Sequence, residues 1–322
     1  MTSTGDDIGR IVAQLEATRA EEASGVKRTA IISLIVGGVI GAGVAIYLQN
    51  PIGLVTAPVA AIIGGLIAHS MAASRWNHSF KHLFVATVAR KHGLEYEPNA
   101  GIEEWEFMAT GLFNQEPDRY STEDLMHGTH EKTKLKCAEI HAEYKTESVD
   151  SKGNRTTHWH TIFRGRMFVF DFNKHFNGVT LVLPDREASW LGGFGETLQK
   201  WAGKLGLAKG ELVKLEDPEF EKLFKVYSTD QVEARYILTP SLMRRILDFR
   251  QALKSDVHCA FFGANLYVAV SSKQDYFEAP SLYQPLEHSL SPEKVHEHEF
   301  DVRFALDLAD QLNLNTRIWS KQ

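Results

Sequence analysis

Residues 29–74 read TAIISLIVGGVIGAGVAIYLQNPIGLVTAPVAAIIGGLIAHSMAAS and contain no Asp, Glu, Lys or Arg. The stretch divides at residues 49–51 into two apolar runs of about twenty residues, the length that crosses a bilayer core of roughly 30 Å as a helix. Because the joint between the runs is short, the second run must return antiparallel to the first. The sequence therefore predicts a two-helix transmembrane hairpin over residues 29–74, an N-terminal segment over 1–28 and a soluble domain over 75–322.

Small residues in the two runs indicate that the helices pack closely. Gly37 and Gly41 have G-x-x-x-G spacing in the first run, and Gly64 and Gly65 lie in the second. Residues of this size let helix backbones approach each other in lipid. We expect the Gly37 face to pack against the second run of the same chain, and homodimerisation through that face is the alternative. The runs carry no buried charge that could mark an ion path, so a transporter is not predicted.

The charges that flank the hairpin predict its orientation. Lys27 and Arg28 precede the first run, Arg75 follows the second, and the joint has no basic residue. The positive-inside rule then places both ends of the hairpin, and so both termini, in the cytoplasm. Trp76, directly after the second run, is expected at the lipid interface.

The first 28 residues do not resemble a secretory signal, which would begin with a short basic leader and a short apolar core. Ile8, Ile11, Val12 and Leu15 recur at helical spacing and predict a cytoplasmic helix. This helix is either a solvated lead-in to the first span or a segment that binds a partner or the membrane surface.

Composition narrows the classes of function. The formal net charge of −6 argues against a nucleic-acid-binding protein, which would show a basic balance or stripe. The two cysteines, Cys137 and Cys259, form no C-x-x-C pair, so a zinc ribbon and a thioredoxin-type site are unsupported. Two lone thiols suit a reducing compartment and leave open a single disulfide.

The soluble domain shows strand periodicity followed by mixed elements. Three strands are expected at 133–147, 156–172 and 178–184, joined as an antiparallel meander, with a bulge near Ala138–Glu139. Residues 226–238 are expected to be partly strand, and Thr239 should cap a helix that begins at Pro240. A hairpin over 258–272 and a last helix over about 298–313 complete the pattern. The predicted fold is α+β, with a mainly antiparallel sheet and flanking helices.

Residues 189–210 read SWLGGFGETLQKWAGKLGLAKG and place aromatic and leucine side chains near helical spacing. One interpretation is an amphipathic helix on the inner leaflet, with Trp190 and Trp201 in the interface. The other is a glycine-flanked helix that packs on the sheet.

Two polar groups are candidates for chemistry. His158 and His160 are two residues apart on an expected strand, so both imidazoles could face one metal ion, and His296 and His298 repeat the spacing. Asp230, Glu233 and Arg235 form either an acid–base site or a structural ion pair, with Glu233 and Arg235 expected on one strand face. No nucleotide-binding or nucleophile-elbow motif is present, and no cofactor is expected.

Two segments carry a resemblance to a known family. HAEYKTESVDSKGNRTTHWHTIFRG (141–165) and FEKLFKVYSTDQVEARYILTPSLMRRI (220–246) resemble the bacterial membrane-protein family catalogued as domain of unknown function 3137. The resemblance covers roughly residues 110–280 and implies a bacterial, membrane-anchored protein. It implies no activity and no catalytic residues.

Together these observations predict a bacterial inner-membrane protein with a cytoplasmic binding or scaffold domain for a protein or lipid partner, without catalysis. The alternative is a metal-dependent enzyme of the membrane surface that uses His158 and His160. A third interpretation is a hairpin oligomer that itself perturbs the bilayer.

Overall fold

The computed structural model describes residues 3–49, 51, 55–113, 115–149, 152–172, 175–185, 210–289 and 292–311. The chain forms two compact units, Met1–Val88 with Phe277–Phe300, and Ala89–Tyr276 with Asp301–Gln322. The domain limits expected at residues 28 and 74 concern membrane topology, so they stay a prediction.

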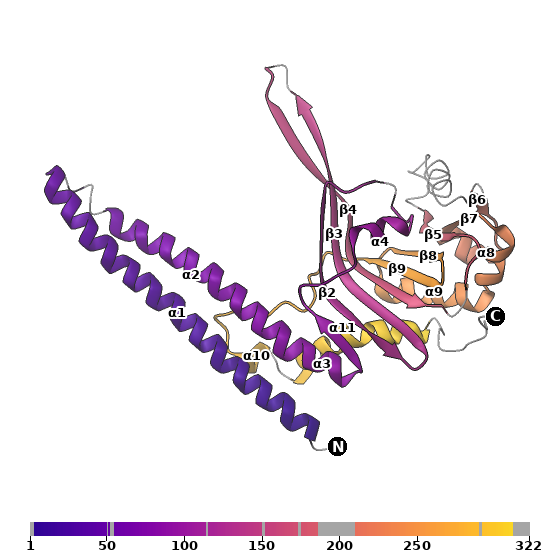
Figure 1. Ribbon diagram of the computed structural model, residues 1–322, viewed down its shortest axis with the longest axis horizontal. Helices are drawn as coiled ribbons and strands as arrows, with labels where there is room; N and C mark the ends of the chain where they lie inside the picture. Colours follow the sequence, from indigo (N-terminus) through magenta and orange to yellow (C-terminus); the bar gives the residue numbers. More distant parts are fainter. Residues whose placement is uncertain are drawn as a thin grey trace. The chain divides into compact units, whose positions relative to one another are not determined.

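The first unit is built on an antiparallel pair of helices, α1 (Ser3–Leu48) and α2 (Thr56–Phe80) (Figure 1). The expected N-terminal helix is continuous with the first apolar run as one helix. The second helix continues through a π-helical turn, Lys81–Val85, into α3 (Ala86–Lys91), and Gly93 with a φ of +75° follows. Glycine reaches this φ at no steric cost, which explains why the helix ends there.

Both helices are long and apolar enough to cross a membrane, over Gly9–Leu48 and Ala57–Lys91. Their large aliphatic side chains point outward, and Val39 is 71% exposed and Ile62 is 62% exposed. A continuous apolar surface of this kind is unfavourable in water and favourable in lipid. The two helices therefore support membrane association.

A segment of the first unit, residues 277–286, lies along the polar end of the helix pair; we call it the strap. The Trp76 indole N–H donates to the Pro280 carbonyl at 2.7 Å, and Arg19 donates to the Leu282 carbonyl at 2.8 Å. The Leu286 N–H donates to the Glu16 carboxylate at 2.9 Å. Side chains from both helices therefore hold the strap.

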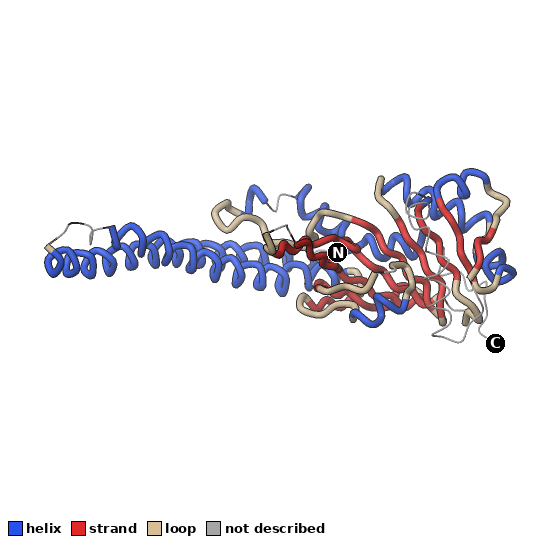
Figure 2. The backbone as a smooth tube through the Cα atoms, turned by 90° about the horizontal axis from the view of Figure 1, so that it is seen from above, coloured by secondary structure: helices blue, strands red, loops and turns tan. Residues whose placement is uncertain are grey.

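The second unit contains one nine-stranded sheet in which every neighbouring pair is antiparallel. Figure 2 draws the strands in red, and their spatial order is β1-β2-β3-β4-β9-β8-β5-β7-β6. The fold is α+β, as the sequence predicts. The strands are β1 (Leu94–Glu97), β2 (Arg119–His130), β3 (Thr133–Val149), β4 (Arg155–Asp171), β5 (Thr180–Pro184), β6 (Glu211–Val213), β7 (Phe224–Ser228), β8 (Val257–Phe262) and β9 (Asn265–Ser271).

The meander expected from the sequence is wrong for its third strand. β3 and β4 are neighbours, but β9 and β8 lie between β4 and β5. Backbone bonds explain the crossing, because the Phe172 N–H donates to Ala264 O and the Phe176 N–H donates to Gly263 O in the β8–β9 turn. The chain therefore passes the end of that hairpin before β5 begins.

The bulge is also displaced from its expected place. Ala138 pairs regularly with Met167, and the register shifts instead between Ala142 and Glu143 on β3. A second shift lies in β2, where Asp124 has a φ of +60°. Beyond Glu143 the two strands continue as an exposed ribbon that includes Arg155–Thr161 (Figure 1).

Both faces of the sheet are covered. On one face, Phe107 of α4 (Glu104–Ala109) packs near Phe163 of β4 in a cluster with Met167. On the other face, Phe168 contacts Phe304 of α11 (Pro292–Gln311), which in turn contacts Phe249. Alternation along β4 thus supplies both cores. The remaining helices are α7 (Pro218–Leu223), α8 (Gln231–Ile237), α9 (Pro240–Leu253) and α10 (Leu286–Ser289).

Several local predictions are confirmed. The Thr239 hydroxyl accepts the Leu242 N–H at the start of α9, with Pro240 in the first turn. The β8–β9 hairpin turns at Gly263, whose φ is +62°. Cys137 and Cys259 are both buried and free.

Candidate functional site

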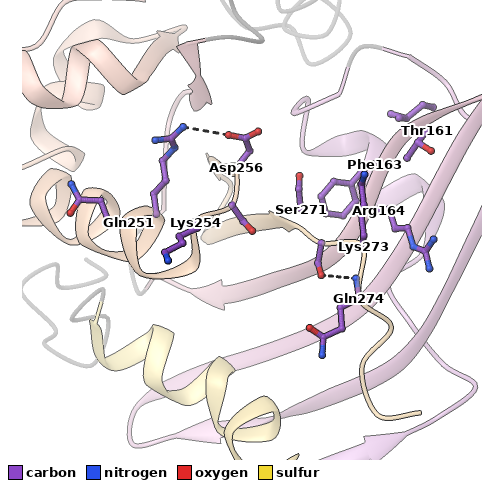
Figure 3. Close-up of a pocket in the computed structure, with 13 residues that line it drawn as sticks. Thr161, Phe163, Arg164, Gln251, Lys254, Asp256, Ser271, Lys273 and Gln274 are labelled. Atoms are coloured by element: carbon purple, nitrogen blue, oxygen red, sulfur yellow. Dashed lines mark hydrogen bonds and ion pairs between the residues drawn. The ribbon is translucent and has the colours of Figure 1, made fainter. Parts of the chain in front are cut away.

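A groove of about 940 Å³ lies in the second unit, beside the middle of β4. We call it the groove. This volume is within the range of ligand pockets in proteins. Figure 3 shows that its side chains come from β4, from the end of α9 with the loop after it, and from the segment after β9. The lining residues are Thr161, Ile162, Phe163, Arg164, Arg250, Gln251, Lys254, Ser255, Asp256, Ser271, Ser272, Lys273 and Gln274.

The groove exists because β9 pairs with only the C-terminal half of β4 and leaves the first half unpaired on that side. β9 pairs with β4 only as far as Gly165–Ser271, after which the Ser272 N–H donates to Arg164 O at 2.9 Å. The Gln274 N–H then bonds the Ser272 hydroxyl at 3.0 Å, which closes a turn that leads the chain away. The side of β4 beyond Arg164 therefore has no pairing strand in the described part of the chain.

The opposite wall is the C-terminus of α9. Lys254 adopts the left-handed conformation, with a φ of +53°, and its N–H caps Arg250 O at 3.0 Å. The Asp256 carbonyl accepts the Ser271 N–H at 3.1 Å, which joins this loop to β9. Helix cap and strand end thus fix the two walls at defined positions.

Cations outnumber anions in the groove. Four lining side chains are Arg or Lys, and Asp256 is the one lining carboxylate. Arg250 contacts Asp256 at 3.4 Å, and Arg164 pairs with Asp275 outside the lining at 2.5 Å. That pair raises the pKa of Arg164, chiefly through the hydrogen bond that the guanidinium donates to the Asp275 carboxylate. For Lys254 and Lys273, the described residues supply no side-chain partner.

The sequence did not point to the groove, because its lining comes from three segments that are distant in the chain. No motif joins residues 161–164 to 250–256 and 271–274. Only the strand order brings them together. The resemblance to a family could not supply the site either, since that family implies no binding residues.

The predicted histidine pair lies on the exposed ribbon. His158 and His160 are both exposed on β4, and the His160 Nε2 is 2.8 Å from the Thr146 hydroxyl. The His160 ring also stacks on Tyr144 at 4.9 Å between centroids. Among the residues that the structure describes, no three His, Cys, Asp or Glu side chains form a group that could hold a metal. Metal binding by this pair, and the enzyme that would use it, stay predictions.

The predicted cluster at Asp230, Glu233 and Arg235 has a different geometry from the one expected. Glu233 and Arg235 lie on helix α8 rather than on a strand, and they do not pair with each other. Asp230 caps the helix by accepting the Val232 and Glu233 N–H groups, both at 2.9 Å. Glu233 accepts the Gly178 N–H at 2.8 Å, and Arg235 bonds the Gln231 side chain at 3.2 Å. These contacts make the cluster structural.

The hairpin glycines lie where the helices are close. Gly37 and Gly41 are buried, and a Cβ on Gly64 would come within 2.7 Å of the Ser33 Cβ. A Cβ on Gly65 would meet the Ala30 Cβ at 3.7 Å. Small residues at these positions let the helices pack, while the homodimer alternative stays a prediction.

Of the three predicted interfacial tryptophans, Trp76 lies within the described residues. The Trp76 side chain is 2% exposed and is bonded to the strap, so a role at the lipid interface stays a prediction. Trp190 and Trp201, together with the amphipathic helix expected at 189–210, lie outside the described residues. His296 and His298 lie on α11, and their side chains are not described.

A second polar cluster, which was not predicted, crosses β1, β2 and β3 and reaches the segment after β9. Burial, together with the charge of Asp124, raises the pKa of Glu139 to about 8. The Tyr96 hydroxyl donates to Asp124, which is 1% exposed, and the Tyr276 N–H donates to Glu139 at 2.8 Å. Burial raises the pKa of Tyr96 above its ordinary value. The signal in the sequence was Glu139, a carboxylate within the expected strand 133–147.

Comparisons with known proteins agree with the expected family. Residues 161–314 match the family described as protein of unknown function (DUF3137). The match contains the whole of the 220–246 segment and the last residues of 141–165, and it extends beyond the expected limit of 280. No curated protein matches the chain.

Among solved structures, the crystal structure of the mycobacterial trehalose monomycolate transport factor A (TtfA) is similar over 69% of this chain and 93% of its own. The identity is 11% and the TM-score 0.32, a likeness too distant to carry an argument. The family match does not depend on this likeness: residues 161–314 of the chain match the family of unknown function DUF3137.

Proposed function

We propose that this chain is a non-catalytic binding protein of the bacterial inner membrane. The two-helix hairpin anchors it, the α+β domain lies at the cytoplasmic face, and the groove is the surface that receives a ligand or partner. The observation that carries the proposal is the outward-facing apolar surface of a helix pair long enough to span a bilayer. Such an anchor fixes the domain at the membrane surface.

The composition of the groove favours binding over catalysis. Its described lining contains no His, Cys or Glu, and the one carboxylate, Asp256, contacts Arg250. A serine or threonine hydroxyl acts as a nucleophile when a general base lies beside it, and Asp256, the carboxylate of the described lining, already contacts Arg250. Hydroxyls and cationic side chains without such a base are suited to hold a ligand in place.

The cytoplasmic side follows from the flanking charges. Lys27, Arg28 and Arg75 adjoin the ends of the hairpin, whereas the joint at residues 49–51 has none. A protein or lipid partner for the domain, and a homodimer formed through the Gly37 face, are further parts of the proposal.

Topology reporters test this proposal directly. A fluorescent protein that folds only in the cytoplasm should be bright when fused after Arg90 of the chain or at its C-terminus. Alkaline phosphatase, which is active only outside, should be active when inserted at Gln49. A phosphatase active after Arg90 and silent at Gln49 would reverse the orientation and contradict the proposal. An insertion in the exposed turn at Lys132 serves as the control for disturbance by the reporter.

A further inference from the structure

We propose that the groove binds a phosphate-bearing ligand whose phosphate lies between Lys254 and Lys273 and whose apolar portion lies on Ile162. This inference rests on the proposed function, because it names the ligand class of the same groove. The ligand is either a lipid headgroup or a soluble phosphate ester, and the experiment below separates these two sources.

The distribution of charge carries the first step. The whole chain has a formal net charge of −6, yet the groove lining has four cations and one carboxylate. Lys254 and Lys273 are exposed, come from opposite walls, and have no side-chain partner among the described residues (Figure 3). The described lining therefore carries an excess of positive charge, which favours an anionic ligand.

Arg250 supplies a second, independent observation. Its Nε is buried and has no hydrogen-bond partner in the described part of the chain, and its contact with Asp256 is 3.4 Å long. The side chain as a whole is 21% exposed and lines the groove, so its outer N–H groups, rather than the buried Nε, are the ones that a phosphate can reach. A phosphate has enough oxygens to accept from these N–H groups as well as from the lysines.

The remaining lining residues suit the same ligand. The hydroxyls of Thr161, Ser255 and Ser271 line the groove and can donate to phosphate oxygens. Ile162 of β4, which is half-buried, adds apolar surface to the lining. A cavity of about 940 Å³ is far larger than one phosphate needs, so the ligand should carry an organic portion.

The dipole of α9 disfavours an anion in the groove, and the nearby cations oppose this effect. The helix ends at Leu253, so its partly negative C-terminus lies at the groove wall. Such a terminus carries about half an elementary charge, whereas Lys254 in the cap and Arg250 one turn earlier each carry a full positive charge. The cations therefore outweigh the dipole.

The test uses the full chain in nanodiscs of phosphatidylcholine and measures binding by calorimetry at low and high salt. The probes are dihexanoyl phosphatidylglycerol, glycerol 3-phosphate and, as a neutral comparison, dihexanoyl phosphatidylcholine. We expect the anionic probes to bind, more weakly at high salt, and the neutral probe not to bind. Tighter binding of dihexanoyl phosphatidylglycerol than of glycerol 3-phosphate supports a lipid source, and equal binding supports a soluble phosphate ester. Binding of neither anionic probe overturns the proposal.

Variants connect any binding to the groove. Replacement of both groove lysines, Lys254→Gln with Lys273→Gln, removes two charge-assisted contacts and should weaken binding at least about tenfold. Lys132→Gln, in the exposed β2–β3 turn, is the matched control and should leave affinity unchanged. Equal affinity of the double variant and the parent chain would place the phosphate elsewhere and overturn the proposal.

Failure here is distinguishable from failure of the proposed function. The groove variants alter no residue of the hairpin, so the topology reporters and membrane retention should be the same in them as in the parent. A chain that is anchored as proposed but binds neither anionic probe would contradict the ligand class alone. Circular dichroism of Lys254→Gln/Lys273→Gln checks that the fold is retained.

Discussion

At the scale of single residues, Gly165 sets the point where β9 can leave β4. Its φ is +152°, and a Cβ there would lie 2.8 Å from the Ser272 N and 3.0 Å from the Ser271 Cα. Gly165→Ala should therefore destabilise the chain by about 1–3 kcal/mol, through overpacking and backbone strain.

Chemical denaturation of the detergent-solubilised chain measures this effect. Gly263→Ala is the matched control, because Gly263 also has a positive φ but nothing within 4 Å of a Cβ. The control should cost only the backbone term, about 1–2 kcal/mol. Equal losses in the two variants would show that the close approach to β9 contributes nothing.

Glu139 should make stability depend on pH. Burial and Asp124 raise its folded pKa to about 8, above its ordinary value of 4.5. The native state then holds a proton that the unfolded state releases, so stability is present at low pH and falls as pH rises from about 5 to about 8. The slope from this group is at most about 1.4 kcal/mol per pH unit.

Thermal unfolding at a series of pH values checks this slope. Glu139→Gln should flatten the profile between about pH 5 and 8, because the amide keeps an acceptor for the Tyr276 N–H without titrating. Glu131→Gln, in an exposed turn, should leave the profile unchanged. An unaltered slope in Glu139→Gln would assign the pH dependence to other groups.

Residue roles were predictable from the sequence where they depend on near neighbours. Thr239 and Pro240 form a local cap, so their role could be predicted, as could the turn at Gly263. Glu233 could not be assigned, because its partners, the N–H groups of Asn177 and Gly178, are more than fifty residues away. The role of the groove lysines could not be predicted either, because no motif surrounds Lys254 or Lys273 in the sequence.

At the scale of elements, the contacts of the strap could not be predicted from the sequence. Side chains of α1 and α2 bond three of its backbone groups, and these side chains are about 200 or more residues away in the chain. The order of the strands was equally hidden, because β5 pairs with β8 through Val182 and Cys259. Strand existence follows from local periodicity, whereas strand order follows from long-range packing.

Loss of Arg19 should loosen the strap. Its guanidinium donates to Leu282 O and bonds Glu16, which in turn accepts the Leu286 N–H. Arg19→Met keeps much of the side-chain volume but leaves that carbonyl without its donor and removes the ion pair. We expect hydrogen exchange at residues 281–287 to become at least about tenfold faster, a loss of about 1.4 kcal/mol in local stability.

Hydrogen exchange with mass spectrometry measures the amide exchange rate of the strap in separate peptides. Gln14→Met, on an exposed position of α1, is the control and should leave exchange of the strap unchanged. Exchange in β8 and β9 should stay at the parent rate in both variants. Parent-like exchange of the strap in Arg19→Met would mean that Trp76 and packing alone hold it.

At the scale of the whole molecule, the two units differ in where their large apolar side chains lie. The hairpin exposes large aliphatic side chains, whereas the second unit buries its own on both faces of the sheet. The sequence allowed this division to be predicted, because a charge-free run is visible without any long-range contact. The family match covers residues 161–314 and so adds nothing about the anchor.

A charge in the middle of each helix tests whether the hairpin is an anchor. Val39 and Ile62 are both highly exposed, so Val39→Arg with Ile62→Arg should not disturb packing between the helices. Each arginine should make membrane insertion less favourable by about 2.5–3.5 kcal/mol. The double variant should therefore move from the alkaline-carbonate-resistant membrane pellet to the soluble or aggregated fraction, while the parent chain stays in the pellet. Ala20→Arg, on an exposed position of α1 before the apolar run, should behave as the parent does. If the double variant stayed in the pellet, the domain rather than the hairpin would hold the chain at the membrane, and the apolar surface of the helices would need a protein partner to cover it.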